Sequence, residues 1–305
     1  MSGRIVVGGE ALVDLVPTER RPLAPLAPRL GGGPFNVAVG LGRLAVPTTM
    51  LTRLSTDAFG DELLARLGES GVDTALVQRG DEPTTLAVVT LDESGAARYS
   101  FHVEGSADRL VADPGPLPDD AVALALGTLS LLLEPGATVY AGLARRAAAE
   151  GLFVSLDPNI REALVGDPDA VRARLDAIAA VAGLVKLSDE DAAWWGREPA
   201  DLVAAGAGAV VVTRGAEGLT AVTATTEVEV PADTSRGLVD TIGAGDSVHA
   251  ALLAHLAEHD LLSTGAVRDL SSDGWREALT FAARVGGWTV SRAGAEPPTR
   301  EEIRA

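Results

Sequence analysis

Cysteine is absent from the sequence, which excludes disulfides, thiolate metal sites and cysteine nucleophiles. Long hydrophobic runs are also missing. The longest one, from Ala121 to Leu133, is interrupted by glycine and hydroxyl residues and is shorter than the ~20 residues that span a membrane. The N-terminus has only a short apolar run after Arg4, too short for a secretion signal. We therefore expect a soluble, cytoplasmic protein with no membrane partner.

Basic residues are scarce. Lysine and arginine together number 25 against 43 acidic residues, which gives a net charge of −18, and no run of five basic residues occurs. Such a surface repels a phosphate backbone, so no nucleic-acid partner is expected. If the ligand is an anion, backbone N–H groups, a metal ion and a few local cations must bind it. The acidic surface also has a simpler use, which is solubility.

Short β-branched runs alternate with helical stretches along most of the 305 residues. This order predicts an α/β fold with a doubly wound, mostly parallel sheet flanked by helices. The expected strands are residues 5–7, 47–54, 121–126, 152–156, 183–187 and 208–213. The clearest helices are residues 61–69, 136–150 and 168–181.

Two segments interrupt this alternation. Residues 10–30 are extended and rich in proline, and residues 84–104 have two alternating arms that predict a hairpin turning at residues 93–95. We expect them to form a small β-sheet that acts as a lid over a cleft; an ordinary surface β-meander is the alternative. An exposed edge of such a sheet also offers a way to form a homodimer. The main domain would then consist of residues 1–9, 31–83 and 105–305.

The segment DTIGAGD, residues 240–246, precedes apolar residues at helical spacing, so Asp246 should lie at the start of a helix. Its glycines let the backbone approach a ligand, and the free N–H groups of a helix start favour an anion. An ionised aspartate there can accept the proton of an attacking hydroxyl during phosphoryl transfer. We therefore expect a catalytic group of Gly243, Ala244, Gly245 and Asp246. The alternative is that Asp246 only caps the helix.

The full DTIGAGD string resembles the D-T-x-G-A-G-D signature of the ribokinase-like (PfkB) carbohydrate kinases. GGGPFN, at the start of residues 31–44, resembles the first signature of that family, and the resemblance covers nearly the whole chain. It implies a ribokinase-like fold, ATP and Mg²⁺, a sugar as the phosphoryl acceptor, and Asp246 as the general base. The sugar contacts that it implies are Asp14, Gly32, Gly33, Asn36 and Asp246.

Residues 126–137, 157–164 and 186–195 are similar to the fructokinase forms of their segments. This resemblance implies D-fructose as the substrate, phosphorylated at a primary hydroxyl. It also implies a phosphate or substrate contact for Arg161, which otherwise would pair with a local carboxylate. The alternatives are a 2-keto-3-deoxygluconate kinase or another sugar kinase of the family, and more remotely a sugar-binding regulator without catalysis. Because a regulator needs neither Asp246 nor the glycines before it, their presence argues against that last alternative.

The resemblance also implies nucleotide and metal positions. The nucleotide contacts would be Lys186, Ser188, Thr213, Gly215, Gly218, Gly243, Gly245 and Ala283. Asp191 stands where the family often has a glutamate that organises metal-bound water; a solvated acidic helix start is the alternative. A monovalent cation such as K⁺ would be bound at Asp240, Ile242, Thr289, Arg292 and Gly294. Pro298 stands where ribokinases offer a hydroxyl ligand, which argues against activation by K⁺.

Histidines give weaker signals. His255 and His259 are four residues apart, but no His-Glu-x-x-His pattern and no third ligand accompany them, so we expect both on a helix surface rather than at a metal. His102 lies on the expected lid strand, where it either contacts the substrate or is a surface residue.

Overall fold

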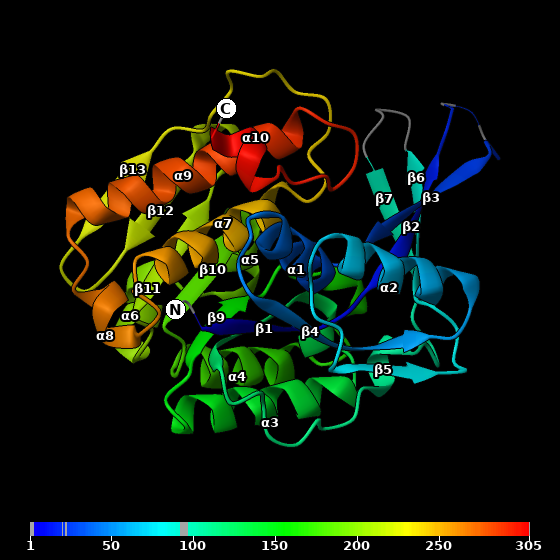
Figure 1. The fold of residues 1–305 in the computed structure, drawn as a ribbon, viewed down its shortest axis with the longest axis horizontal. Coiled ribbons are helices and arrows are strands. Elements are labelled where there is room, and N and C mark those ends of the chain that lie inside the picture. Colours follow the sequence, from blue (N-terminus) through cyan, green and yellow to red (C-terminus); the bar gives the residue numbers. More distant parts are fainter. Residues whose placement is uncertain (1–2, 20, 22, 92–96, 305) are drawn as a thin grey trace.

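Two β-sheets of unequal size organise the chain (Figure 1). The structure is a computed structural model and describes residues 3–19, 21, 23–91 and 97–304. The larger sheet has nine strands in the order β13-β12-β11-β10-β9-β8-β1-β4-β5, and its strands are parallel except for β12 and β13. The predicted, mostly parallel sheet is confirmed. Its strands are β1 (Arg4–Gly8), β4 (Thr48–Ser55), β5 (Val77–Gly80), β8 (Ala121–Gly127), β9 (Phe153–Asp157), β10 (Leu184–Ser188), β11 (Ala209–Thr213), β12 (Leu219–Val222) and β13 (Glu227–Val230).

Helices cover both faces of this sheet, as Figure 1 shows for α1 and α7 above it and α3 and α4 below it. Because strand side chains alternate between faces, Ile5 and Val7 belong to one hydrophobic core and Val6 to the other. One core includes residues of α1 (Gly33–Arg43), α2 (Ala58–Glu69), α7 (Ala244–Glu258), α8 (Thr264–Arg268), α9 (Ser272–Val290) and α10 (Arg300–Arg304). The other includes residues of α3 (Gly136–Ala149), α4 (Pro168–Ala179), α5 (Asp189–Trp195) and α6 (Pro199–Ala205).

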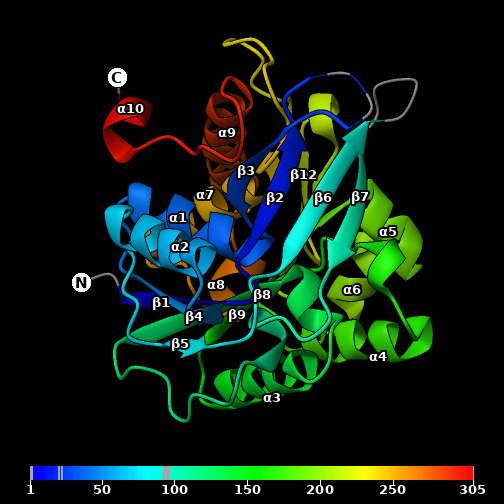
Figure 2. The same cartoon turned by 90° about the vertical axis from the view of Figure 1, so that its right-hand side faces the viewer.

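The smaller sheet has four strands in the order β3-β2-β6-β7 and stands apart from the layered body (Figure 2). They are β2 (Leu12–Pro17), β3 (Leu26–Gly31), β6 (Leu86–Leu91) and β7 (Ala97–His102). β2 pairs with β3 antiparallel and with β6 parallel, so the two segments that interrupt the alternation do form one sheet, as predicted. The expected turn at residues 93–95 lies outside the described residues.

The structure differs from the sequence-based expectations at three places. β5 and the β12–β13 hairpin were not predicted, because each strand has only four residues and lacks a long apolar run. His255 is buried rather than on the helix surface, since its ring stacks on His259 and lies near Phe281 of α9. Burial lowers the pKa of His255 to about 4.

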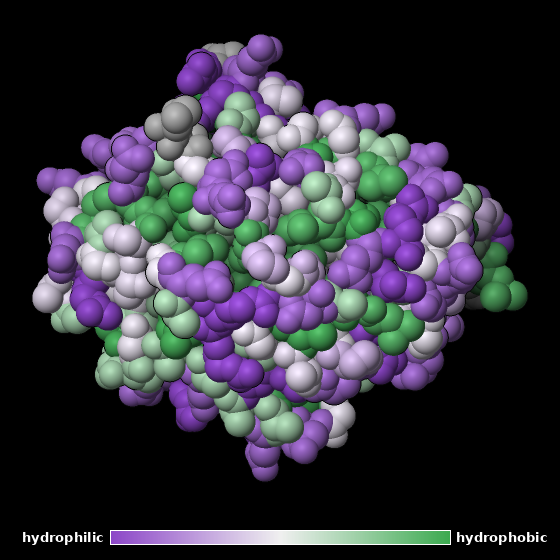
Figure 3. Space-filling model, turned by 60° about the horizontal axis from the view of Figure 1, so that its bottom comes forward, coloured by the Kyte–Doolittle hydropathy of each residue, from purple (hydrophilic) through white to green (hydrophobic). Residues whose placement is uncertain are grey.

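The surface of the protein agrees with its acidic composition and with its lack of long hydrophobic runs. No helix among the described residues is long and apolar enough to cross a membrane. Figure 3 shows the face that includes α3 and α4, on which hydrophilic residues are spread between groups of hydrophobic ones. This distribution is normal for a protein surface that carries an excess of acidic residues.

The start of α2 connects the main body to the small sheet. The Asp57 carboxylate caps α2 by accepting a hydrogen bond from the Gly60 N–H at 2.8 Å. The same carboxylate accepts bonds from the N–H of Thr84 at 2.9 Å and from its hydroxyl at 2.7 Å, just before β6. Gly60 itself is buried, and a Cβ there would lie 1.9 Å from the carbonyl oxygen of Ser55. The Asp57 cap of α2 therefore depends on glycine at position 60, because a side chain there would collide with the backbone of Ser55.

Substitution of Gly60 tests this close approach. We expect Gly60→Ala to lower the free energy of unfolding by about 1–3 kcal/mol, because the added methyl group forces the backbone of α2 away from β4. Gly68→Ala in the same helix is the matched control, since nothing lies within 4 Å of its Cβ position. That variant should gain ~0.5–1 kcal/mol from helix propensity. Urea unfolding of both variants measures the difference, and equal stabilities would show that the packing around Gly60 adapts freely.

Candidate active site

A cavity of about 280 Å³ lies where the small sheet meets the carboxyl ends of the parallel strands. Parallel strands of doubly wound sheets commonly bind ligands at this end. The predicted site residues that line the cavity are Asp14, Gly32, Gly33, Asn36, Arg161, Lys186, Ile242, Gly243, Gly245 and Asp246. The residues that were not predicted are Glu10, Leu12, Tyr99, Phe101, Thr128, Leu129, Asn159 and Thr241. Ala244 is the first residue of α7 but does not line the cavity.

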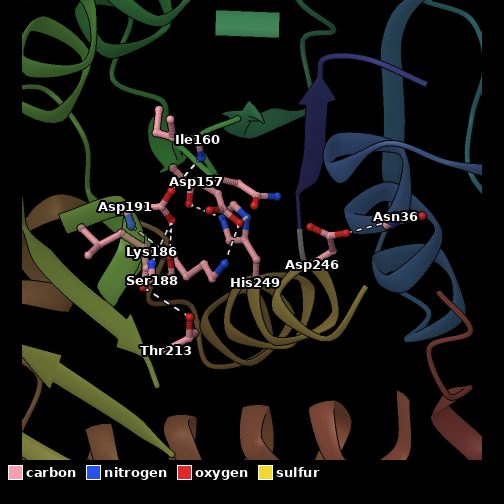
Figure 4. A network of polar contacts seen from close by, with 12 residues as sticks. Asn36, Asp157, Ile160, Lys186, Ser188, Asp191, Thr213, Asp246 and His249 are labelled. Carbon is pink, nitrogen blue, oxygen red and sulfur yellow. Dashed lines mark hydrogen bonds and ion pairs between the residues drawn. The ribbon is translucent and has the colours of Figure 1, made fainter. Parts of the chain in front are cut away.

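Asp246 occupies the first turn of α7 and is 7% exposed. The N-cap of α7 is Gly243, in the left-handed region with φ 73°, and no side chain caps the helix. The Asp246 carboxylate instead accepts a hydrogen bond of 2.8 Å from the Asn36 amide of α1 (Figure 4). The capping interpretation of Asp246 is therefore wrong, because Gly243 is the N-cap and the Asp246 carboxylate accepts no hydrogen bond from an N–H group of α7.

The start of α7 has the features of an anion site. The backbone N–H groups of Gly245 and Asp246 have no hydrogen-bond partner among the described residues, as expected for a first helical turn. Burial raises the pKa of Asp246 above its usual range, while the Asn36 hydrogen bond and the charges of Lys186 and Arg161 lower it. Asp246 is thus a buried carboxylate beside free N–H donors, and it faces a cavity.

The opposite wall of the cavity comes from the loop before α1 and from β2. Gly32 has φ 107°, and a Cβ there would lie 2.7 Å from the carbonyl oxygen of Glu10, so only glycine fits at this position. Asp14 projects from β2; burial raises its pKa to about 6, although Arg161 acts in the opposite direction. This wall therefore combines a carboxylate with a backbone that a ligand can approach closely.

Arg161 follows β9 and lines the cavity between Asp14 and Asp246. One of its terminal nitrogens donates to the Asn159 side-chain oxygen at 2.7 Å and to the Asn159 carbonyl oxygen at 3.0 Å. Among the described residues, no carboxylate lies within ion-pair distance of its guanidinium. The alternative in which Arg161 only pairs with a local carboxylate is not what the structure shows.

The small sheet supplies two aromatic side chains to the cavity, Tyr99 and Phe101 of β7. Their rings stack with centroids 5.9 Å apart. His102, which was a candidate for substrate contact, is exposed and does not line the cavity. The reason is the two-residue period of a strand, which turns His102 away when Tyr99 and Phe101 face inward.

Thr128 and Asn159 line the cavity but were not predicted as site residues. They follow β8 and β9 and have positive φ values of 59° and 38°, although neither is glycine. Such backbone conformations are concentrated at functional sites. A sequence contains no direct signal for a strained φ. Their position directly after two parallel strands is the only indication available from the pattern.

A buried polar network lies beside Asp246 (Figure 4). The Lys186 ammonium donates to the Asp157 carboxylate at 2.9 Å, and both side chains are at most 5% exposed. Burial raises the pKa of Asp157 to about 7, although the positive charge of Lys186 acts to lower it. Behind this pair, the His249 ring on α7 hydrogen-bonds to the hydroxyl of Ser155 at 2.7 Å. Burial lowers the pKa of His249 to about 3, so its ring is neutral.

The other predicted nucleotide residues, Ser188, Thr213, Gly215, Gly218 and Ala283, do not line the cavity. Ser188 and Thr213 are register partners at the ends of β10 and β11. Gly215 and Gly218 follow β11, and Gly218 has φ 108°, with its Cβ position 2.1 Å from the Val230 carbonyl oxygen. Ala283 is buried on α9. The structure thus groups the first four at one end of the sheet.

Asp191 takes part in a capping box at the start of α5. One of its carboxylate oxygens accepts from the Ser188 N–H and hydroxyl at 2.9 and 2.8 Å, and the other accepts from the Ile160 N–H at 2.6 Å. Asp191 is 4% exposed, so the alternative of a solvated acidic helix start is wrong for this residue. Over the described residues, no group of three or more histidines and acidic residues is placed to bind a metal.

The five positions for a monovalent cation are close to one another at the end of α9. The Asp240 carboxylate accepts from the Ile242 N–H at 3.1 Å and from the Gly294 N–H at 2.8 Å. The Arg292 N–H donates to the Thr289 carbonyl at 3.1 Å, while its guanidinium pairs with Glu302 at 2.5 Å and lies over the Trp288 ring. The Asp240–Gly294 bond therefore joins the two segments on which a cation would depend.

Comparison with known proteins places this site in a family. The model of the pfkB family carbohydrate kinases matches residues 2–302. A fructokinase of Rhizobium leguminosarum bv. trifolii is 39% identical over 89% of this chain and 85% of that protein. A fructokinase of Escherichia coli is 32% identical over 100% of this chain and 99% of its own length.

Solved structures agree with this placement. A fructokinase of Xylella fastidiosa with bound ATP has a TM-score of 0.89 and 30% identity, with 100% of this chain and 98% of that chain covered. A fructokinase of Vibrio cholerae O395 with bound fructose, ADP and potassium has a TM-score of 0.85 and 25% identity, with 99% of this chain and 97% of that chain covered. The match extends over the whole fold, with the small sheet included. The chain belongs to the pfkB family of carbohydrate kinases.

Proposed function

We propose that the protein is a fructokinase that transfers the γ-phosphoryl group of ATP to a primary hydroxyl of D-fructose. One observation carries the proposal: the buried Asp246 carboxylate and the free N–H groups of α7 face the same cavity as Asp14, Asn36 and Arg161. The curated relatives named fructokinase, which are 39% and 32% identical, favour fructose within the family.

Asp246 acts as the general base in this proposal. The bond between the γ-phosphorus and the bridging oxygen of ATP breaks, and a new bond forms to the sugar oxygen. The hydroxyl proton passes to Asp246, and ADP leaves. The free N–H groups of Gly245 and Asp246 stabilise the charge of the transferred group. Because a carboxylate with a raised pKa is a stronger base than an exposed one, burial of Asp246 aids the proton transfer.

Metal ions enter the proposal in two ways. Mg²⁺ commonly binds through substrate phosphates and water with only one or two carboxylates, so it would be bound mainly by ATP, with Asp191 as a water-mediated contact. Both Asp191 oxygens already accept hydrogen bonds from the protein. A water molecule bound to Mg²⁺ would therefore have to donate to a further lone pair of one of these oxygens. If a monovalent cation binds, its place would be near the Asp240–Gly294 contact. The structure of a Vibrio cholerae fructokinase with bound potassium supports K⁺ as a ligand, while Pro298 argues against activation by K⁺.

The sugar is tested by a coupled assay of ADP release over a panel of D-fructose, 2-keto-3-deoxygluconate and ribose. We expect D-fructose to have the highest kcat/KM. A tenfold preference corresponds to ~1.4 kcal/mol of transition-state discrimination. A kcat/KM for either other sugar at least tenfold above that for fructose would replace fructokinase by the corresponding sugar kinase. Binding of sugar without any turnover would favour the regulator.

The small sheet is proposed to act as a lid, made of residues 10–30 and 84–104, on a main domain of residues 1–9, 31–83 and 105–305. Tyr99, Phe101, Leu12 and Asp14 of this sheet line the cavity, which supports the assignment. Closure over bound sugar would exclude water from phosphoryl transfer. The edge strands β3 and β7 are the places where a second copy would pair if the protein is a homodimer.

Hydrogen exchange tests the lid. With saturating fructose, the amides of β2 and β7 should exchange more slowly, because closure removes them from solvent and restricts local opening. The amides of α3, on the far side of the large sheet, provide an internal control that should not change. Exchange in β2 and β7 that does not slow, in a sample shown by calorimetry to bind fructose, would contradict a closing lid.

The role of Asp246 is tested with Asp246→Asn, which preserves size and can still accept the Asn36 hydrogen bond. Loss of the base should lower kcat by about 10²–10⁴-fold. The affinities for ATP and fructose and the melting temperature should change little. Asp14→Asn is the matched control, because Asp14 is another carboxylate of the cavity with a raised pKa but is proposed only to bind sugar. It should mainly raise the KM for fructose. If Asp246→Asn retains more than about a tenth of kcat, the base is another residue.

A further inference from the structure

We propose that Asp157 is a positioning residue, which keeps the buried Lys186 charged and aimed at the start of α7, and that Lys186 thereby stabilises the transferred phosphoryl group. This inference rests on the proposed function. The family resemblance already implies a nucleotide contact for Lys186, and the new role is that of Asp157. Neither Asp157 nor its neighbours His249 and Ser155 is otherwise part of the proposed chemistry.

The geometry places the Lys186 ammonium at the anion site. Lys186 lines the cavity from β10, and a Cβ built on Gly245 would lie only 3.0 Å from its nitrogen. Gly245 provides one of the two free N–H groups of the α7 start. An anion bound to these N–H groups would therefore lie within reach of a full positive charge, which a helix start alone does not supply.

A lysine in this position needs a partner to stay charged. The side chain is 4% exposed, and burial alone would lower its pKa. The negative charges around it outweigh this effect, so that its pKa is raised. The ionisable groups that face it are Asp157 of β9, Asp191 of α5, and Asp246 and His249 of α7. Of these four groups, Asp157 is the one that contacts the ammonium directly, at 2.9 Å.

Asp157 is held in turn by its surroundings. It is the last residue of β9, and a Cβ on the neighbouring Gly127 would lie 2.1 Å from its carbonyl oxygen, so the strand end is tightly packed. The His249 Nδ1 lies 3.8 Å from the Asp157 carboxylate, and Ser155 fixes the other ring nitrogen. The neutral His249 ring thus packs beside the same Asp157 oxygen that binds Lys186, at a distance too long for a hydrogen bond, so Lys186 keeps this oxygen as its own partner.

The Asp157 carboxylate oxygen that does not contact Lys186 has no hydrogen-bond partner in the described part of the chain. A buried carboxylate with one unpaired oxygen is unfavourable for stability. A costly arrangement of this kind beside the anion site is explained if the pair serves catalysis. Lys186 itself donates one hydrogen bond to Asp157, so its other N–H groups are available to a phosphoryl group.

A double-mutant cycle on Lys186 and Asp157 tests the proposal. Lys186→Met should lower kcat for fructose phosphorylation by about 10²–10³-fold, the typical effect of removing one transition-state donor. Lys186→Arg should restore part of this loss. Asp157→Asn should lower kcat by roughly tenfold or more in the wild-type background and should have almost no further effect in the Lys186→Met background. Asp113→Asn, which breaks an exposed ion pair with Arg146, is the control and should leave kcat unchanged.

A binding measurement separates this inference from the proposed function. Calorimetry would compare the affinity for ADP with the affinity for ADP plus aluminium fluoride, which mimics the transferred group. Lys186→Met and Asp157→Asn should weaken the fluoride complex at least tenfold while the affinity for ADP changes less than twofold. If the wild-type protein phosphorylates no sugar, the proposed function fails, and the fluoride complex still reports on Lys186. An equal loss of kcat from Asp157→Asn in both backgrounds, or an unweakened fluoride complex, would overturn the positioning role.

Discussion

The unpaired N–H groups at the start of α7 are the feature on which the site depends. Asp246, Gly243 and Gly245 all belong to the turn that leaves these donors free. The first turn of any helix has such unpaired N–H donors. The chain must add only a residue whose backbone can turn sharply into the helix, and Gly243 with φ 73° is that residue. The sheet, the loop before α1 and the small sheet then place their side chains around this turn.

The net negative charge of the protein makes the binding of an anion at this site more demanding. A protein with a net charge of −18 that binds a polyanion must supply attraction locally. Lys186 and Arg161 are the cations that line the cavity, and neither is neutralised by a surface carboxylate. Lys186 is buried and Arg161 is held by the Asn159 side chain, so both charges act in a partly desolvated space where they are stronger than on the surface.

Much of the fold was predictable, because local hydrophobic patterns indicate the alternation of strands and helices. The long elements, for example β4 and α3, agree with prediction within one or two residues. The short β5 was missed, since it depends on pairing with β4 rather than on its own composition. In the site, Asp246 and Asn36 were found through motifs. Thr128, Asn159 and Tyr99 were missed because their roles depend on backbone strain and strand orientation, which only the assembled structure defines.

The Asn36–Asp246 hydrogen bond joins residues 210 positions apart in the chain. Closing a loop of this length costs more conformational entropy than forming the local contacts of a helix. During synthesis, the ribosome releases α1 and the first strands well before α7 exists. A chain that ends before residue 240 therefore has the Asn36 amide but lacks the Asp246 carboxylate proposed as the base. On the proposed mechanism, such an incomplete chain would transfer no phosphoryl group.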